Sequence, residues 1–145
     1  MRIGNKSAAL ASAVALAACV ASLTAAPAGA AVAAGPCGSG YKLVGTYDIS
    51  KGGKQGTLEV RWNAGTGKNC ALAYGTGANY GRTAYKGVRI KVHGTSGWAG
   101  SDAGQYKYYA GPVYVTARGK CISVAGDIKG SQGIAFAFQQ RVHCG

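Results

Sequence analysis

The chain has 145 residues, and 16 Lys and Arg against four Asp and Glu give it a formal net charge of +12. This length holds one compact domain rather than two. So basic a chain is expected to meet anionic surfaces such as wall polymers, acidic glycans or lipid headgroups. The basic residues are spread singly, however, which equally suits a solvated surface.

Residues 1–30 have the pattern of a cleaved secretory signal peptide. Arg2 and Lys6 supply the charge, an apolar stretch follows, and Ala28-Gly-Ala30 fits a cleavage site. Cleavage after residue 33 fits as well. The remaining chain would be secreted with a net charge of +10, because Arg2 and Lys6 are lost.

The region after the signal, residues 31–145, is predicted to form one all-β domain with a flexible lead-in over residues 31–40. No later stretch approaches the roughly 20 apolar residues of a membrane-spanning helix, so we expect no transmembrane segment. Leu16-Ala-Ala-Cys19 resembles a lipobox, which leaves open a lipoprotein anchored through Cys19.

The predicted strands alternate apolar and polar side chains, which indicates one buried face. In chain order they cover residues 41–49, 57–64, 70–74, 88–93, 105–110, 113–117, 121–125 and 134–138. Residues 94–104 are expected to be irregular, and residues 126–133 are expected to form a loop. In the second strand Trp62 is predicted to lie in the core. The pattern favours a small antiparallel sandwich or barrel of about seven or eight strands.

Two of the predicted hairpins share a design, with Gly and Lys in the turn and a cysteine early in the return strand. Four cysteines follow the predicted signal peptide, and an even number in an exported chain predicts two disulfides, each stabilising the fold by roughly 3 kcal/mol. Three pairings are possible. We favour the two disulfides that are local in sequence, Cys37 with Cys70 and Cys121 with Cys144.

Three segments together resemble the spore-associated protein family of filamentous actinobacteria. They are residues 37–44, residues 64–70 and residues 109–121, and the likeness extends over nearly the whole mature chain. The resemblance implies a small exported protein of the spore or cell envelope. It carries no catalytic motif that maps onto this chain.

Catalysis and cofactors are not expected from the residues. There is no nucleophile elbow, phosphate loop or dinucleotide fingerprint, and a Ser96, His93 and Asp102 triad would require a rigidity that a glycine-rich loop lacks. Metal binding is not expected either, because there is no C-x-x-C and the two histidines are isolated. Hydrolase, antimicrobial and nucleic-acid-binding functions are therefore disfavoured.

Binding through aromatic and basic side chains is the function that we expect. Trp98 lies in a glycine-rich loop, where it either stacks on a ligand or caps one end of the fold. The other candidates for an aromatic platform with a basic rim are Tyr80, Tyr106, Tyr108, Arg89 and Lys91. Its partners would be cell-wall or spore-surface polymers.

The alternative is a secreted protease inhibitor that presents a loop supported by a disulfide. In that hypothesis Lys120, next to Cys121, serves as the specificity residue for a secreted protease. Edge protection and solubility are an equally simple explanation of a lysine in a hairpin turn.

Overall fold

The computed structural model describes residues 34–145, so the expectations about the signal peptide, its cleavage and Cys19 lie outside the described residues. These residues form eight antiparallel strands and a single turn of 3-10 helix, η1 (Gly77–Asn79). The strands are β1 (Lys42–Ser50), β2 (Lys54–Asn63), β3 (Lys68–Gly75), β4 (Ala84–Val92), β5 (Gly100–Tyr106), β6 (Tyr109–Thr116), β7 (Ile122–Gly130) and β8 (Gly133–Val142).

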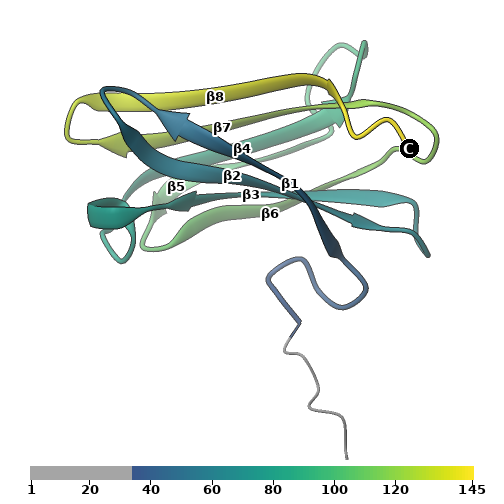
Figure 1. The fold of residues 1–145 in the computed structure, drawn as a ribbon, viewed down its shortest axis with the longest axis horizontal. Helices are drawn as coiled ribbons and strands as arrows, with labels where there is room; N and C mark the ends of the chain where they lie inside the picture. Colours follow the sequence, from purple (N-terminus) through teal and green to yellow (C-terminus); the bar gives the residue numbers. More distant parts are fainter. Residues whose placement is uncertain (1–33) are drawn as a thin grey trace, which may run out of the picture. The chain divides into compact units, whose positions relative to one another are not determined.

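The strands belong to one nearly closed, barrel-like sheet with the order β5-β4-β7-β8-β1-β2-β3-β6. Figure 1 shows it bent so that β4, β7 and β8 lie opposite β1, β2, β3 and β6. One pair of residues, Ser50 and Phe136, joins β1 to β8. At the other seam the backbone N–H of Gly111 in β6 donates to Asp102 of β5 at 2.6 Å. The predicted all-β architecture is confirmed.

The core fills the space between the two layers. It is built from small and β-branched side chains that alternate with outward-facing residues along each strand, as a half-buried strand requires. The completely buried members include Ile49, Leu58, Val60, Val88, Ile90, Ile122, Val124 and Ile128. A second, smaller cluster on the outer face of β3 surrounds the disulfide of Cys37 with Cys70.

Both favoured disulfides are confirmed, Cys37 with Cys70 and Cys121 with Cys144. The first joins the lead-in to β3, next to the edge strand β6, and the second joins the chain end to the start of β7. Within residues 34–145 no helix has the length and apolar composition needed to cross a membrane.

Two expectations about strand bounds are wrong. The predicted strand over residues 105–110 contains the end of β5, a turn at residues 107–108 and the start of β6, and β5 begins at Gly100 within the stretch expected to be irregular. The predicted loop over residues 126–133 is strand, apart from two turn residues. The glycines of this stretch allow close packing within a strand and do not form a loop, since a Cβ on Gly126 would lie 2.9 Å from Cδ1 of Ile49.

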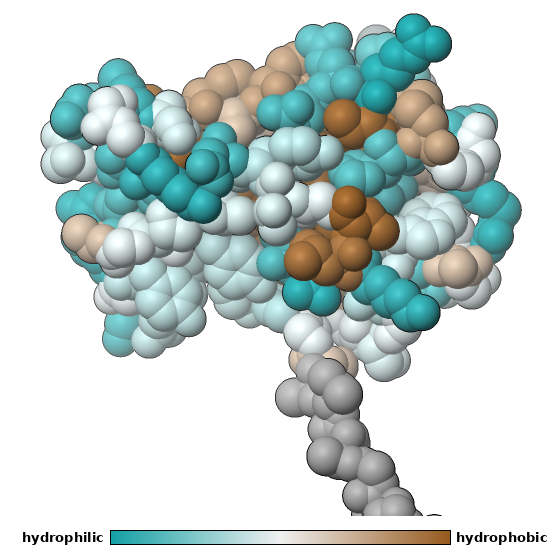
Figure 2. Space-filling view, in the orientation of Figure 1, coloured by the Kyte–Doolittle hydropathy of each residue, from teal (hydrophilic) through white to brown (hydrophobic). Residues whose placement is uncertain are grey.

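The ends of β1 and β2 differ from the expected pattern as well. A register shift between Leu43 and Gly45 turns Leu43 outward, where 52% of it is exposed, and Val44 is 41% exposed. Figure 2 shows brown, apolar surface near the beginning of β1. In β2, Trp62 is half-buried rather than part of the core. The shift in β1 displaces the alternation by one residue and exposes Leu43 and Val44, whereas the pairing of β2 with β3 is regular through Trp62.

Candidate binding surface

Strand β4 places Arg89 and Lys91 on the outer face of the sheet, because the residues between and beside them, Val88 and Ile90, point into the core. Trp98 follows in the loop between β4 and β5 and lies against both cations. The guanidinium carbon of Arg89 is 5.4 Å from the centroid of the indole, and Nζ of Lys91 is 5.3 Å from it. These distances are within the range of cation–π attraction.

Strand β8 adds aromatic side chains to the same surface. Its alanines, Ala135 and Ala137, point into the core, whereas Ile134, Phe136 and Phe138 are exposed by 52%, 51% and 37%. Phe138 meets Trp98 edge-on at a centroid distance of 6.1 Å, and Phe136 lies 6.3 Å from Phe138. Figure 2 shows tan, apolar surface along the upper part of the view, where β8 runs in Figure 1.

We call the set Arg89, Lys91, Trp98, Phe136 and Phe138 the Trp98 platform. Phe136 and Phe138 are not among the binding residues predicted from the sequence, because the alternation of residues 134–138 does not indicate which face of the strand is buried. The pattern of alanine between large residues was the available signal, since a narrow core accepts alanine and leaves the rings outside.

Strand β7 lies between β4 and β8 and forms the base of the platform. Ala125 pairs with Arg89 on one side and with Phe138 on the other, and it is completely buried although it lies on the outer face. The loop that carries Trp98 returns to β4 through a bond from the N–H of Ala99 to the carbonyl of Ile90 at 2.9 Å. Trp98 is half-buried and does not cap the end of the core.

The two cations of the platform differ in their partners. Arg89 forms an ion pair with Asp127 at 2.9 Å, so part of its charge is neutralised within the molecule. Lys91 donates to the carbonyl of Thr95 at 2.9 Å, and no carboxylate in residues 34–145 pairs with it. An anionic ligand would therefore meet its stronger attraction at Lys91.

A hollow of about 260 Å³ adjoins the platform, lined by residues that include Lys91, His93, Ser123 and Phe138. Nδ1 of His93 and the hydroxyl of Ser123 are 3.0 Å apart, so both are held in place at its side. The hollow gives the platform a concave edge with polar groups beside an aromatic ring. Within residues 34–145 no cluster of three metal-binding side chains was found.

The three candidate tyrosines do not join the platform. Tyr80 and Tyr108 form a separate exposed pair with centroids 5.0 Å apart, and Nζ of Lys107 lies 5.5 Å from the ring of Tyr108. They flank the opposite end of β4, which has nine residues and so spans roughly 26 Å. The sequence suggested one surface, and the fold makes two.

Tyr106 is a structural anchor. Its hydroxyl donates to Asp102 at 2.6 Å, and that hydrogen bond, together with burial, raises the pKa of Tyr106. Its ring packs against the core. This geometry suits holding β5 against β6 better than contacting a ligand.

Lys120 lies in the tight turn between β6 and β7. Its N–H donates to the carbonyl of Ala117 at 3.0 Å, and Gly119 has a φ of 68°. The turn is exposed and stands next to the disulfide of Cys121, as expected. Protease inhibition through Lys120 stays a prediction, and no contact of this side chain favours it.

Comparison with known proteins gives one informative likeness. The chain is 42% identical to spore-associated protein A of Streptomyces coelicolor (strain ATCC BAA-471 / A3(2) / M145) over 114 residues, which cover 73% of this chain and 69% of the relative. This chain belongs to the spore-associated protein family. No protein-family model and no solved structure matches it.

Membership of the spore-associated protein family agrees with the resemblance seen in residues 37–44, 64–70 and 109–121. The relative's name gives a location for that protein and says nothing of a ligand. The ligand of this chain must therefore be inferred from the residues on its own surface.

Proposed function

We propose that this protein is a non-catalytic protein of the spore or cell surface that binds anionic or glycan polymers of the envelope through the Trp98 platform. The observation that carries the proposal is the indole of Trp98, which is partly open to solvent and lies within 5.5 Å of two cationic groups. The family relationship supports the location, because the relative is named for its association with spores.

The platform combines two kinds of contact. The exposed rings of Phe136 and Phe138, with the edge of Trp98, offer flat apolar area for the C–H faces of sugar rings. Lys91, which has no carboxylate partner in the described residues, offers its charge to a phosphate or carboxylate of the polymer. Single contacts of this kind are weak, so binding depends on the aromatic and the cationic contacts of the platform acting together on one ligand.

The acidic side chains support a non-catalytic function. All four carboxylates of the sequence already have partners: Asp48 with Lys54, Glu59 with Arg61, Asp127 with Arg89, and Asp102 with Tyr106 and Gly111. His93 bonds to Ser123 rather than to Asp102. A general acid or base would have to give up one of these bonds.

The test is co-sedimentation of residues 34–145 with isolated cell walls and spores across a salt series. We expect binding at low salt that weakens as the salt rises, because screening shortens the reach of surface charges. Trp98→Ala should weaken binding about tenfold, as expected for the loss of an aromatic anchor. Lys91→Ala should weaken it by roughly three- to tenfold and reduce the salt dependence.

Lys120→Ala is the matched control, since it removes the same charge from a turn outside the platform. It should bind as the parent protein does. Absence of binding at low salt would refute the proposal, and so would equal losses in Lys91→Ala and Lys120→Ala. Circular dichroism of each variant separates lost binding from lost folding.

A further inference from the structure

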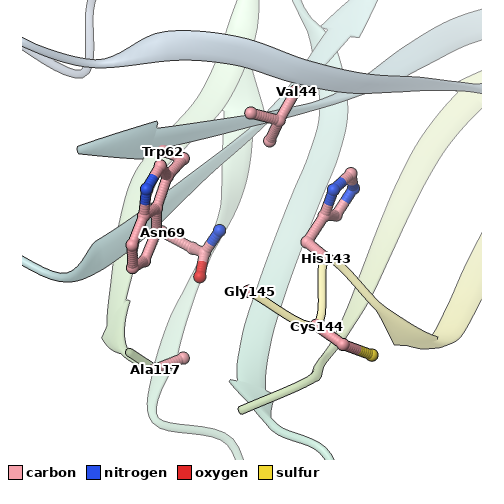
Figure 3. Close-up of a pocket in the computed structure, with 7 residues that line it drawn as sticks. All are labelled: Val44, Trp62, Asn69, Ala117, His143, Cys144 and Gly145. Carbon is pink, nitrogen blue, oxygen red and sulfur yellow. The ribbon is translucent and has the colours of Figure 1, made fainter. Parts of the chain in front are cut away.

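A second pocket lies at one end of the core, between the two layers of the sheet. It has a volume of about 180 Å³, and its lining includes Val44, Trp62, Asn69, Ala117 and His143. Figure 3 shows the indole of Trp62 and the imidazole of His143 on opposite sides of it. It shares no residue with the Trp98 platform. Ligands commonly bind in the mouths of such β-folds.

Asn69 is the unusual residue of this pocket. It pairs with Trp62 across β2 and β3, is 1% exposed, and its Oδ1 has no hydrogen-bond partner in residues 34–145. Figure 3 shows its carboxamide extending between Trp62 and His143. A buried polar atom without a partner destabilises a fold, because its hydrogen bond to water is lost and not replaced. A ligand that donates a hydrogen bond would relieve this cost.

The walls indicate what else the ligand carries. Trp62 offers a flat face that is half-buried, and Val44 and Ala117 offer small apolar surfaces. Nε2 of His143 is 2.9 Å from the hydroxyl of Tyr47, and burial lowers the pKa of His143. Cys144 and Gly145 complete the described lining, which contains no Lys, Arg, Asp or Glu side chain, so the side chains of the pocket favour a neutral ligand.

We propose that this pocket binds a neutral N-acetylated amino sugar. The acetamido N–H would donate to Oδ1 of Asn69, and the acetyl methyl group would contact Val44 and Ala117. The apolar face of the sugar ring would stack on Trp62, the arrangement that aromatic side chains favour for such faces. The volume suits one sugar ring rather than a chain of them. The proposal is independent of the Trp98 platform.

The experiment is a titration of ¹⁵N-labelled protein with N-acetylglucosamine, followed by NMR. Only two tryptophans exist, so the indole N–H of Trp62 and that of Trp98 report on the two sites separately. N-acetylglucosamine should shift the signals of Trp62 and of the Asn69 side chain, and saturate in the millimolar range that is usual for a few contacts. Glucose and glucosamine, which lack the acetyl group, should bind at least tenfold more weakly.

Asn69→Leu is the decisive variant. It replaces the carboxamide by an apolar group of similar size, so it should keep or raise the stability of the fold while weakening the sugar at least tenfold. Gln132→Leu, the same kind of exchange at an exposed turn at the other end of β8, should leave binding unchanged. No saturable shift of Trp62, equal shifts with all three sugars, or full binding by Asn69→Leu would each overturn the proposal.

Discussion

His143 is held in a position that resists protonation. Burial lowers its pKa below the usual 6.5, so above pH 6.5 the folded state keeps its full stability. As the pH falls from 6.5 through the lowered pKa, the unfolded chain takes up a proton that the folded protein does not, and stability is lost. Urea unfolding between neutral pH and about pH 5, above the range where carboxylates titrate, should show this loss.

His143→Gln should remove most of that dependence, whereas His93→Gln, which leaves His143 in place, should keep it. Equal pH dependences in both variants would show that His143 is not the group responsible. The same measurement bears on the pocket, because a neutral His143 is what an uncharged ligand would meet there.

The two tryptophans show how far single residues could be predicted. The alternation in β2 correctly placed Trp62 on the inner face, and it could not show that the core ends at Val60, which leaves the ring at a pocket. The glycine loop correctly suggested that Trp98 is not a core residue. Its contacts with Phe136 and Phe138 depend on which face of β8 is buried, and this is decided by packing across the sheet.

Strand β3 ends at a very close approach between two elements. A Cβ on Gly75 would overlap the carbonyl of Asn79 in η1, and η1 cannot easily move. The side chain of Asn79 donates to the carbonyl of Gln55 at 3.1 Å, and Arg82 donates to it at 3.0 Å. Gly75 is therefore needed for its size, although its φ is not positive.

Gly75→Ala should lower the free energy of unfolding by about 1–3 kcal/mol, the usual cost of overpacking. The control is Gly35→Ala, where the nearest atom would be 3.9 Å from the new Cβ and little change is expected. Urea unfolding measures the difference in the free energy of unfolding between each variant and the parent protein, provided that the dependence of this free energy on urea concentration is unchanged. If the two variants are equally stable, η1 adapts more readily than its hydrogen bonds indicate.

The element that sequence patterns describe least well is the first half of β4. Lys86 is completely buried there, with its Nζ donating to the carbonyl of Arg82 at 2.9 Å and to that of Tyr106 at 2.7 Å. Burial, with a smaller effect of Arg82, lowers the pKa of Lys86. A lysine marks a surface position in any alternation, so only the fold shows that this side chain ties two turns together.

On the scale of the whole molecule, the class of fold can be predicted from the sequence. The all-β architecture and the absence of long helices from residues 34–145 follow from alternation and glycine content. The two disulfides are favoured among three possible pairings because they are local in sequence, and the structure contains both. The arrangement of the surface cannot be predicted in this way, because it depends on the order of strands in the sheet. Tyr80 and Tyr108 lie beside the start of β4, whereas Arg89, Lys91 and Trp98 of the platform belong to its second half and to the loop that follows.

The disulfide of Cys121 with Cys144 acts on the molecule as a whole, because it closes a segment that contains β7 and β8. With a sequence separation of 23 residues, its loss should destabilise the fold by about 3 kcal/mol, chiefly by freeing the unfolded chain. Cys121→Ser/Cys144→Ser should therefore lower the melting temperature by roughly 10–20 °C.

The double variant of Cys37 and Cys70 is the comparison, and it should lose a similar amount because its loop is only moderately longer, at 33 residues. The two double variants should differ in their effect on the pocket. Loss of the Cys121–Cys144 bridge releases the segment that carries His143, whereas loss of the other bridge does not. Only the variant without Cys121 and Cys144 should therefore change the NMR signal of the Trp62 indole N–H. An unchanged melting temperature would mean that packing alone holds the end of β8, and the pocket would then not depend on this bridge.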